Sequence, residues 1–479
     1  MQPSQPRRER RGRDRWPVGD HRGIPPRARC RDRRPGRAAA VPAVSYRVRR
    51  RTAPFDKCDT GCQPPHTPSH AADLIRPMSG AQGSDSVADV RVLIAPDSFG
   101  GTMSAVEAAE AIAAGWRRAA QASEIVSVPL SDGGPGMLDV IVAGFDAHGV
   151  ESQTLMATVP GPRGLLVPVM IVVQEQTAYI ESAQACGLHL VARDARDPWT
   201  STSAGLGLVL DHARDAGVDR IVVGLGGTGT LDAGAGLLAA LGAHAWDGEG
   251  RAASEQLRCG PSGFADVARV DIMPAVQDWA GVDVIAAVDV DVPLTGPHGA
   301  AHGFGAQKFP DPAAVTAEQL GDLEESIARF AGLVHGHLDT PDLTTRAGSG
   351  AAGGIGWALQ CLGATVVPGI DIVAATVGLH DLLDGVDVVI TGEGRLDWQS
   401  RRGKVISGVA EQASARGIPV VAVAGRVDLG ARELAGLGIV EAWSLAEQPG
   451  GLARSMISAH QALADAAARI AAQWGSGAT

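Results

Sequence analysis

The stretch 221–236 combines the residue types of a phosphate-binding loop. An apolar run is followed by glycines, threonines and Asp232, and then by the alanine- and leucine-rich segment 235–242, which predicts a helix. Glycine lets backbone N–H groups approach a phosphate, and a helix start adds a favourable partial charge. Asp232 adds a carboxylate that can bind Mg²⁺ or accept a proton. The stretch therefore predicts an anion site whose binding residues are Gly226, Gly227 and Thr228.

A second glycine-rich helix start lies at residues 348–354. Both it and residues 224–229 match the pattern G-x-G-x-x-G, which also occurs in dinucleotide-binding loops. With 62 glycines in the chain, such matches also arise by chance and a tight turn is the simpler alternative. We predict Gly350 and Gly353 as further phosphate-binding residues and keep a dinucleotide-dependent oxidoreductase as an alternative function.

Lysine is scarce in this sequence and occurs in two polar glycine loops. The chain contains three lysines, Lys57, Lys308 and Lys404. Lys308 follows the glycine-rich segment 303–307, and Lys404 follows Gly403. A lysine ammonium is a compact charge suited to phosphate oxygens, so both loops fit phosphate binding. A solvent-exposed lysine without a ligand is the alternative for each.

Polar residues follow several apolar stretches that we predict to be strands. They are Asp97 and Ser98 after 90–95, Asp132 after 124–130, Asp289 after 282–288, and Glu393 and Arg395 after 385–390. In parallel sheets ligands bind at the carboxyl ends of the strands, so these side chains fall where chemistry is expected. Turn and cap roles are the alternative for the Asp and Ser residues.

The predicted elements alternate between strands and helices at both ends of the chain. A helix at 105–120 begins with a capping box, Ser104 and Glu107, and a hairpin is expected at 165–173 and 177–182. We predict one parallel sheet built from residues 89–152 and 366–479, with a different α/β domain, 153–365, inserted between them.

The first 77 residues differ from the rest in charge. They contain 19 Lys and Arg against 7 Asp and Glu, whereas residues 78–479 contain 23 against 46. This arginine- and proline-rich stretch has no hydrophobic period and cannot bury enough apolar surface to fold. We predict that residues 1–88 are a disordered tail, with Met78 as an alternative start. A nucleic-acid-binding arm and a transit peptide are the other interpretations.

The acidic balance of residues 78–479 argues against nucleic acid or an anionic membrane as the main partner. The six cysteines are spread along the chain, which suggests no disulfide framework and fits a reducing compartment. No apolar run approaches the ~20 residues that span a bilayer. We expect a cytoplasmic protein that acts on small molecules, with no nucleic-acid or membrane partner and a homodimer as a candidate assembly.

Seven motifs, in order, resemble the bacterial two-domain glycerate kinase family, which is unrelated to P-loop kinases. They are APDSFGG (95–101), SDGGPG (131–136), GLGGTGTLDAGAG (224–236), DVDVPLTGPHGA (289–300), FGAQK (304–308), GSGAAGG (348–354) and TGEGRLDWQSRRGK (391–404). The resemblance implies an α/β fold in which a flavodoxin-like parallel-sheet domain is interrupted by a second, inserted α/β domain. It also implies phosphorylation of D-glycerate, to 2-phosphoglycerate, or of a similar hydroxy acid, with ATP and Mg²⁺.

Phosphoryl transfer needs positioning, charge neutralisation and a carboxylate near the attacking hydroxyl. From the resemblance we expect the catalytic residues Asp132, Asp232, Glu393 and Lys404 and the metal ligand Asp289. Substrate or phosphate binding is expected of Asp97, Ser98, Gly226, Gly227, Thr228, Lys308, Gly350, Gly353 and Arg395. The sequence does not divide the carboxylates between metal ligands and proton acceptor.

Four positions depart from the family pattern. Gly100 replaces a usual lysine, Pro135 follows the glycine pair where Glu-Gly-Thr is usual, and Leu231 and Val292 replace usual asparagines. A site built for a small polar acid loses affinity when hydrogen-bond partners are removed. A non-catalytic homologue that binds a nucleotide or a phosphorylated metabolite is therefore the main alternative.

Overall fold

The computed structural model describes residues 90–335, 342–401 and 404–475. The predicted tail, residues 1–88, lies outside this part of the chain. Within the described residues, no helix combines the length and the apolar character needed to cross a bilayer.

The first sheet joins strands from the two ends of the described chain. Its strands are β1 (Arg91–Ile94), β2 (Glu124–Ser127), β11 (Val388–Leu396), β12 (Val420–Val427) and β13 (Ile439–Ser444). Their spatial order is β13-β12-β11-β1-β2, and every pairing is parallel. Counted within this sheet, the order is 2-1-3-4-5, which is that of flavodoxin-like folds. The predicted flavodoxin-like α/β class is therefore confirmed.

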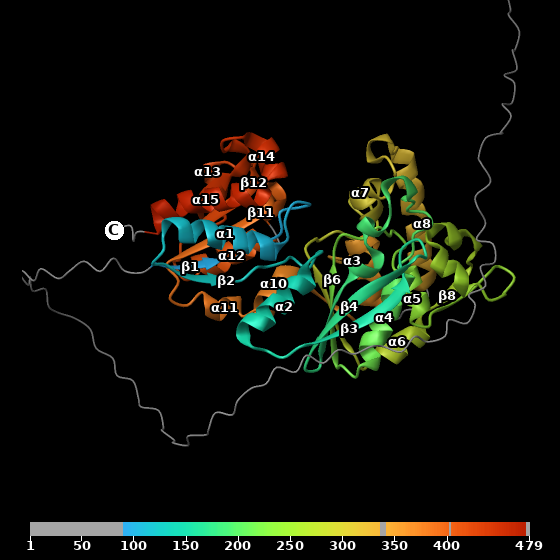
Figure 1. Ribbon diagram of the computed structural model, residues 1–479. Helices are drawn as coiled ribbons and strands as arrows, with labels where there is room; N and C mark the ends of the chain where they lie inside the picture. The colour runs from blue at the N-terminus through green and yellow to red at the C-terminus, as the bar shows by residue number, and fades with distance from the viewer. Residues whose placement is uncertain (1–89, 336–341, 402–403, 476–479) are drawn as a thin grey trace, which may run out of the picture. The chain divides into compact units, whose positions relative to one another are not determined.

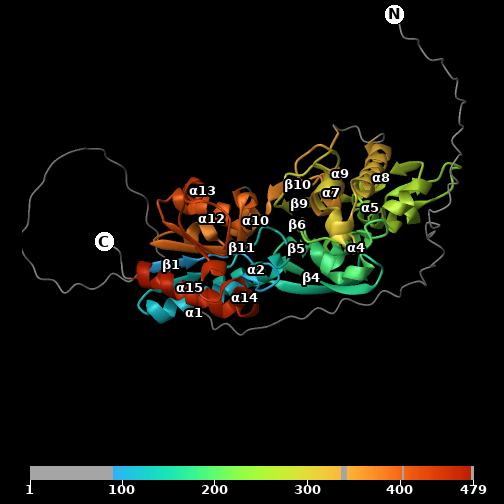
Figure 2. The ribbon, with the colours of Figure 1, turned by 90° about the horizontal axis from the view of Figure 1, so that it is seen from above.

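Helices cover both faces of this sheet (Figures 1 and 2). Val92 and Ile94 of β1 pack with α1 (Ala105–Ala119) and α15 (Ala459–Trp474). Leu93 and the following Ala95 pack with α2 (Met137–His148), α10 (Gly369–Thr376) and α12 (Val405–Ser414). Successive side chains of a strand point to opposite faces, so a strand covered on both sides is apolar throughout.

The predicted capping box at the start of α1 is confirmed. The backbone N–H of Glu107 donates to Ser104 Oγ at 3.2 Å, and the Ser104 N–H donates to the Glu107 carboxylate at 2.8 Å. These hydrogen bonds lower the pKa of Glu107. The helix that follows the first site loop therefore has a fixed starting point.

The second sheet has six strands in the order β10-β9-β6-β5-β4-β3. They are β3 (Gln153–Pro160), β4 (Leu166–Gln174), β5 (Thr177–Glu181), β6 (Arg220–Leu225), β9 (Asp283–Val288) and β10 (Thr365–Pro368). Strands β3, β4 and β5 pair antiparallel, which confirms the predicted hairpin, and the other pairings are parallel. The boundary proposed at residue 366 falls inside β10, and the division into 89–152 with 366–479, and 153–365, stays a prediction.

The remaining elements surround these sheets. A two-stranded ribbon consists of β7 (His244–Trp246) and β8 (Arg269–Asp271). The other helices are α3 (Ser182–Cys186), α4 (Ala204–Asp215), α5 (Ala235–Ala240), α6 (Met273–Trp279), α7 (Ala300–Phe304), α8 (Ala317–His335), α9 (Ile355–Cys361), α11 (Leu379–Leu382), α13 (Ala431–Gly436) and α14 (Gly451–Ile457). Helices α4, α5, α8 and α9 share one apolar core with the six-stranded sheet.

Candidate active site

The strand order of the first sheet reverses between β1 and β11, and ligands of such sheets bind outside this point. The loop after β1 runs along the end of β11, because the Asp97 N–H donates to the Gly392 carbonyl at 2.8 Å. A Cβ added to Gly394 would lie 3.0 Å from the backbone nitrogen of Gly100. The fold therefore brings the motif at 95–101 beside the motif at 391–404.

Four acidic residues and one lysine interact electrostatically here, and one of them, Asp289, follows β9 of the second sheet. They are Asp97, Asp132, Asp289, Glu393 and Lys404. Burial, and then the charge of Asp132, raises the pKa of Asp97 to about 8. Such perturbed carboxyl groups gather at functional sites more often than elsewhere.

Two more of these carboxyl groups are shifted, each with burial as the largest cause. Burial raises the pKa of Glu393 to about 7, against the effects of a hydrogen bond from Ser400 and the charge of Lys404. Burial and the neighbouring carboxylate of Asp132 raise the pKa of Asp289 to about 6, while Lys404 opposes them. The residues that sequence reasoning placed after four different strands thus act on one another.

The turn after β2 is shaped by glycine. The Gly134 N–H donates to Asp132 Oδ1 at 3.1 Å, and the Gly133 N–H donates to Ser131 Oγ at 3.2 Å. Gly133 has φ +93°, and a Cβ on Gly369 at the start of α10 would lie 1.8 Å from the Asp132 carbonyl oxygen. Glycine at these places lets the backbone hold Asp132 at the strand end.

Two positioning residues were missed from the sequence. Ser400 donates a hydrogen bond of 2.5 Å to Glu393 Oε1, and Glu181 at the end of β5 accepts hydrogen bonds from the N–H groups of Gly136 and Leu138. Ser400 lies within the motif 391–404 and could have been selected there. Glu181 caps the first turn of α2 from a distant strand, which no local pattern predicts.

Asp232 lies apart from the solvent. It is 0% exposed, and its carboxylate accepts hydrogen bonds from Ser203 N, Ser203 Oγ, Gly234 N and Gly236 N. The N–H groups of Gly234 and Gly236 at the start of α5, where we expected a favourable partial charge for a phosphate, therefore bind this carboxylate. The placement gives no support to a direct catalytic role for Asp232.

Lys308 is buried beside the same loop. It is 1% exposed and donates a hydrogen bond to the Thr230 carbonyl. Burial lowers its pKa to about 8, against the opposing charge of Asp232. Its ammonium group therefore binds a backbone carbonyl inside the protein. This placement gives no support to direct phosphate binding by Lys308.

The two glycine loops are bound to other backbone. Gly226 and Gly227 lie against Gly134 and Pro135, since a Cβ on either would come within 2.8 Å of that loop. Thr228 is buried and forms an isolated bridge with Gly187. These contacts join the loop after β6 to the turn that carries Asp132.

The backbone of the second glycine loop, residues 348–354, forms hydrogen bonds with other parts of the protein. The Gly350 N–H donates to the Val292 carbonyl at 2.8 Å, and the Gly353 carbonyl accepts from the Ala233 N–H at 3.0 Å. Ala233 and Ala352 have φ values of 51° and 54°, a conformation that costs a residue with a Cβ about 1–2 kcal/mol. Strained backbone of this kind persists where surrounding contacts fix it.

The departures from the family pattern differ in their surroundings. A Cβ on Gly100 would have nothing within 4 Å, so this position opens into free space. Leu231, in contrast, is fully buried in the core of the six-stranded sheet. The expectation that all four positions face a ligand therefore does not hold for Leu231, because an apolar side chain there packs against other apolar groups.

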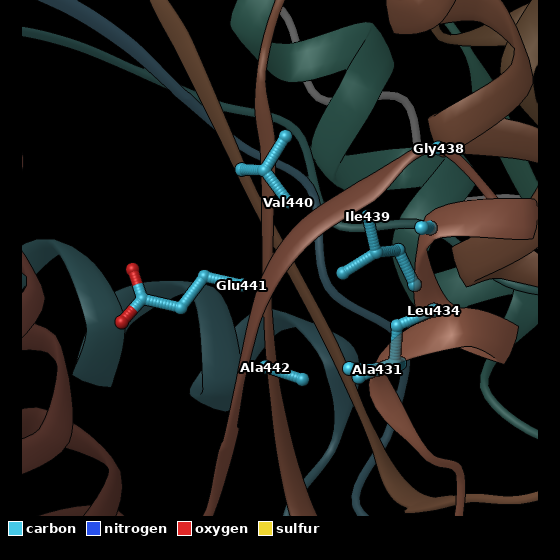
Figure 3. Close-up of a pocket in the computed structure, with 8 residues that line it drawn as sticks. Ala431, Leu434, Gly438, Ile439, Val440, Glu441 and Ala442 are labelled. Carbon is cyan, nitrogen blue, oxygen red and sulfur yellow. The ribbon is translucent and has the colours of Figure 1, made fainter.

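A hollow of about 530 Å³ lies between α13 and β13, outside the candidate site. It is lined by Ala431, Leu434, Ala435, Gly438, Ile439, Val440, Glu441 and Ala442. Figure 3 shows the Glu441 carboxylate pointing away from Leu434, and this carboxylate accepts a hydrogen bond from Trp474 Nε1. None of the predicted site residues lines this hollow, and its apolar wall does not suit an anionic substrate.

The donor set at the strand ends suits a hard cation. Among the described residues, no three His, Cys, Asp or Glu side chains lie close enough to form a metal cluster. Mg²⁺ in phosphate-transferring sites is commonly bound by one or two carboxylates together with substrate phosphates. The neighbouring carboxylates of Asp132 and Asp289 fit that smaller set.

The fold and the site together define an α/β protein with a carboxylate-rich site at the switch point of a parallel sheet. The sequence model of the glycerate kinase family matches residues 92–475. The chain belongs to the glycerate kinase family.

Named relatives and a solved structure agree with this assignment. A glycerate kinase of Halalkalibacterium halodurans is 36% identical over 79% of this chain and 97% of its own length. A glycerate 2-kinase of Escherichia coli is 37% identical over 70% of this chain and 85% of its own length. A crystal structure from Salmonella typhimurium LT2, described as a glycerate kinase 2, superposes with a TM-score of 0.66 at 34% identity and covers 81% of this chain and 99% of that one.

Proposed function

We propose that this protein transfers the γ-phosphoryl group of ATP to a hydroxyl group of D-glycerate, forming 2-phosphoglycerate and ADP. The names of the relatives support the substrate, and the convergence of Asp97, Asp132, Asp289, Glu393 and Lys404 at the switch point carries the proposal. In the reaction, the bond between the γ-phosphorus and its bridging oxygen breaks. A bond from that phosphorus to the substrate oxygen forms, and the hydroxyl proton leaves.

Glu393 is the proposed acceptor of the hydroxyl proton. Its pKa of about 7 is close to the working pH, where a proton acceptor is most effective. Ser400 binds one of its carboxylate oxygens and so fixes the orientation of the group. Asp97 and Ser98 would orient the substrate from the neighbouring loop.

Cationic groups would counter the charge that develops on phosphate. Lys404 precedes α12 and acts electrostatically on both Asp289 and Glu393, so it lies where transferred phosphate oxygens are expected. Arg395 is the proposed clamp for the carboxylate of the acid. The amides of Gly226, Gly227, Thr228 and Gly353 stay proposed contacts to phosphate, whereas the Gly350 amide donates to the Val292 carbonyl inside the protein.

We assign Asp232 and Lys308 a different task from the one expected. Their burial and internal hydrogen bonds support a positioning role, in which they hold the two glycine loops in place. Neither would touch the substrate.

Asp132 and Asp289 are the proposed ligands of Mg²⁺, which would neutralise phosphate charge when bound. A thermal shift measurement tests this without turnover: adding MgCl₂ to the full chain at pH 8 is expected to raise the Tm, because the cation favours two neighbouring ionised carboxylates. The D289N variant removes one of them and is expected to lose most of the shift. An equal shift in D289N would overturn the assignment.

ADP release by the full chain, with ATP, MgCl₂ and D-glycerate, tests the function, and phosphorus NMR of the product identifies the phosphorylated oxygen. Turnover with glycerate would support the proposal. Turnover with another hydroxy acid alone would change the substrate. Silence across a panel of acids, with ATP still binding, would favour the non-catalytic homologue.

The acidic charge of residues 78–479 supports free small molecules rather than nucleic acid as partners. We propose the cytoplasm as the place of action and a homodimer as the assembly to test. Light scattering of the purified chain measures the second point directly.

A further inference from the structure

Arg395 and Arg426 lie side by side at the carboxyl ends of β11 and β12. The two residues are register partners in this parallel pair, and their side chains are 61% and 62% exposed. Arg395 follows Glu393 by two residues at the carboxyl end of β11. Both guanidinium groups therefore belong to the edge of the sheet that carries the site carboxylates.

One carboxylate holds both arginines. Arg395 Nε donates to Asp428 Oδ2 at 2.8 Å, and Arg426 Nε donates to Asp428 Oδ1 at 2.6 Å. The backbone of Asp428 is itself fixed, because its N–H donates to the Leu396 carbonyl at 2.8 Å. A carboxylate bound in this way sets the directions of the two planar groups relative to each other.

Asp428 does not use all the N–H donors of the two guanidinium groups. Each guanidinium carries five N–H groups in a fixed plane. Asp428 accepts through the Nε edge of both and approaches Nη2 of Arg395 at 2.6 Å, and Asp397 lies 3.4 Å from Arg395 Nε. The contacts of both arginines are therefore concentrated on the edges that face Asp428, while most of each side chain faces solvent.

Two like charges opposite each other on neighbouring strands destabilise a sheet unless anions separate them. The site also contains four carboxyl groups that repel anionic substrates, so cations at its exposed rim are needed to bind an acid or a nucleotide. Asp428 meets the first condition, and the exposed guanidinium groups of Arg395 and Arg426 meet the second, because guanidinium binds carboxylate and phosphate through two parallel hydrogen bonds.

We propose that Arg395 and Arg426 together form a two-armed subsite for a substrate oxyanion, with Asp428 as the positioning residue between them. The inference rests on the proposed kinase function and adds Arg426 and Asp428 to its site. The oxyanion is either the carboxylate of the acid or a phosphate of the nucleotide, and both have the same chemistry for a guanidinium fork.

Steady-state kinetics of the full chain test the subsite. The variant R426Q removes the charge and the fork, and R426K keeps the charge only. The variant D428N keeps both arginines but removes their common anchor. The matched control is R220Q, because Arg220 also lies on a strand and pairs with an aspartate across to the next strand, at 2.7 Å from Asp283 with 53% exposure.

Loss of a charge-assisted bidentate contact is expected to raise one KM by about 10- to 100-fold in R426Q. R426K should lie between R426Q and the wild type, because charge alone restores part of the contact. In D428N the same KM should rise with kcat nearly unchanged, since a disordered fork weakens binding rather than chemistry. R220Q should match the wild type in both constants.

A rise in the KM for D-glycerate alone would identify the carboxylate, and a rise in the KM for ATP alone would identify a phosphate. Equal KM values in R426Q and R220Q, with folded protein by thermal melting, would overturn the subsite. If the wild type transfers no phosphate, the proposed function fails separately. Calorimetric titration of wild type and R426Q with ATP and with D-glycerate then decides the subsite on its own: weaker binding of either ligand to R426Q supports it, and unchanged binding of both overturns it.

Discussion

Ser400 Oγ lies 2.5 Å from Glu393 Oε1 and donates a hydrogen bond to it, across the turn that follows β11. The Asp397 N–H donates to the same hydroxyl at 3.2 Å, so the serine is fixed from the other side as well. Glu393 is buried, and this hydrogen bond is the first of the effects that oppose the rise of its pKa. The turn therefore lowers the pKa of the proposed proton acceptor from the value that burial alone would give.

The S400A variant should move the acidic limb of the pH profile of kcat/KM to higher pH. Without the hydroxyl, the charged form of Glu393 loses a donor, its pKa rises, and more of it is protonated at a given pH. A shift of about one pH unit is expected. S400T keeps the hydroxyl and should restore the wild-type limb. An unshifted limb in S400A would show that Glu393 is not the group that titrates in turnover.

Asp97 should make the metal-free protein less stable as the pH rises. Its pKa is raised from 3.8 to about 8, so between these values the folded state holds a proton that the unfolded state has released. By linkage the free energy of unfolding falls across this window and is fully retained only below it. D97N cannot ionise, and its Tm at pH 8 should exceed that of the wild type by about 5–10 °C.

Thermal melts of wild type and D97N from pH 5 to pH 8, in buffers free of Mg²⁺, measure this difference. The difference between the two proteins should shrink steadily from pH 8 to pH 5, because the proton that the folded state retains is released from the unfolded state only above about pH 3.8. Parallel curves over the whole range would mean that Asp97 ionises as easily in the folded chain as in the unfolded one.

The flavodoxin-like sheet could be predicted because the pattern that indicates it lies in short, continuous stretches of the sequence. Strand, polar loop and helix follow one another at 90–120, and parallel strands place their loop residues at one edge, so Asp97 and Glu393 could be assigned to a common site before any coordinates.

Burial could not be predicted in the same way. The glycines around Asp232 have the composition of an anion cradle, but the composition does not reveal that the carboxylate of the same loop fills it. Leu231 and Lys308 show the same limit, because their depth depends on packing between segments far apart in sequence. Asp428 joins Arg395 and Arg426 from beyond the end of β12, and its role is visible only once the strands are in register.

Lys308 should be important for folding rather than for phosphate binding. K308M removes the donor that the buried Thr230 carbonyl accepts from and a charge that acts on the buried Asp232, so it should lower the free energy of unfolding by about 1–3 kcal/mol. The second variant is the double mutant K308M/D232N, in which the unpaired carboxylate is also neutralised. It should recover part of the loss.

Chemical denaturation of the four proteins in this cycle measures the coupling between Lys308 and Asp232. Additive losses would show that the two charges do not stabilise each other. Where K308M still turns over, a raised KM for ATP with wild-type stability would instead favour the direct phosphate contact that the sequence suggested.

Gly100 offers a test by gain of function. The resemblance to the family implies a lysine there, and the position has free space for a Cβ and lies beside the end of β11. G100K should therefore fold as the wild type does and, if the loop faces an anionic substrate, lower a substrate KM by several-fold, because the added ammonium group offsets the surrounding carboxylates. L231N is the matched contrast, since the same kind of reversion at a buried position places an amide in an apolar core and should cost stability by about 1–3 kcal/mol without improving either KM. Kinetics and melting curves of both variants separate the two cases, and a G100K protein with unchanged KM values would mean that this loop lies away from the bound substrates.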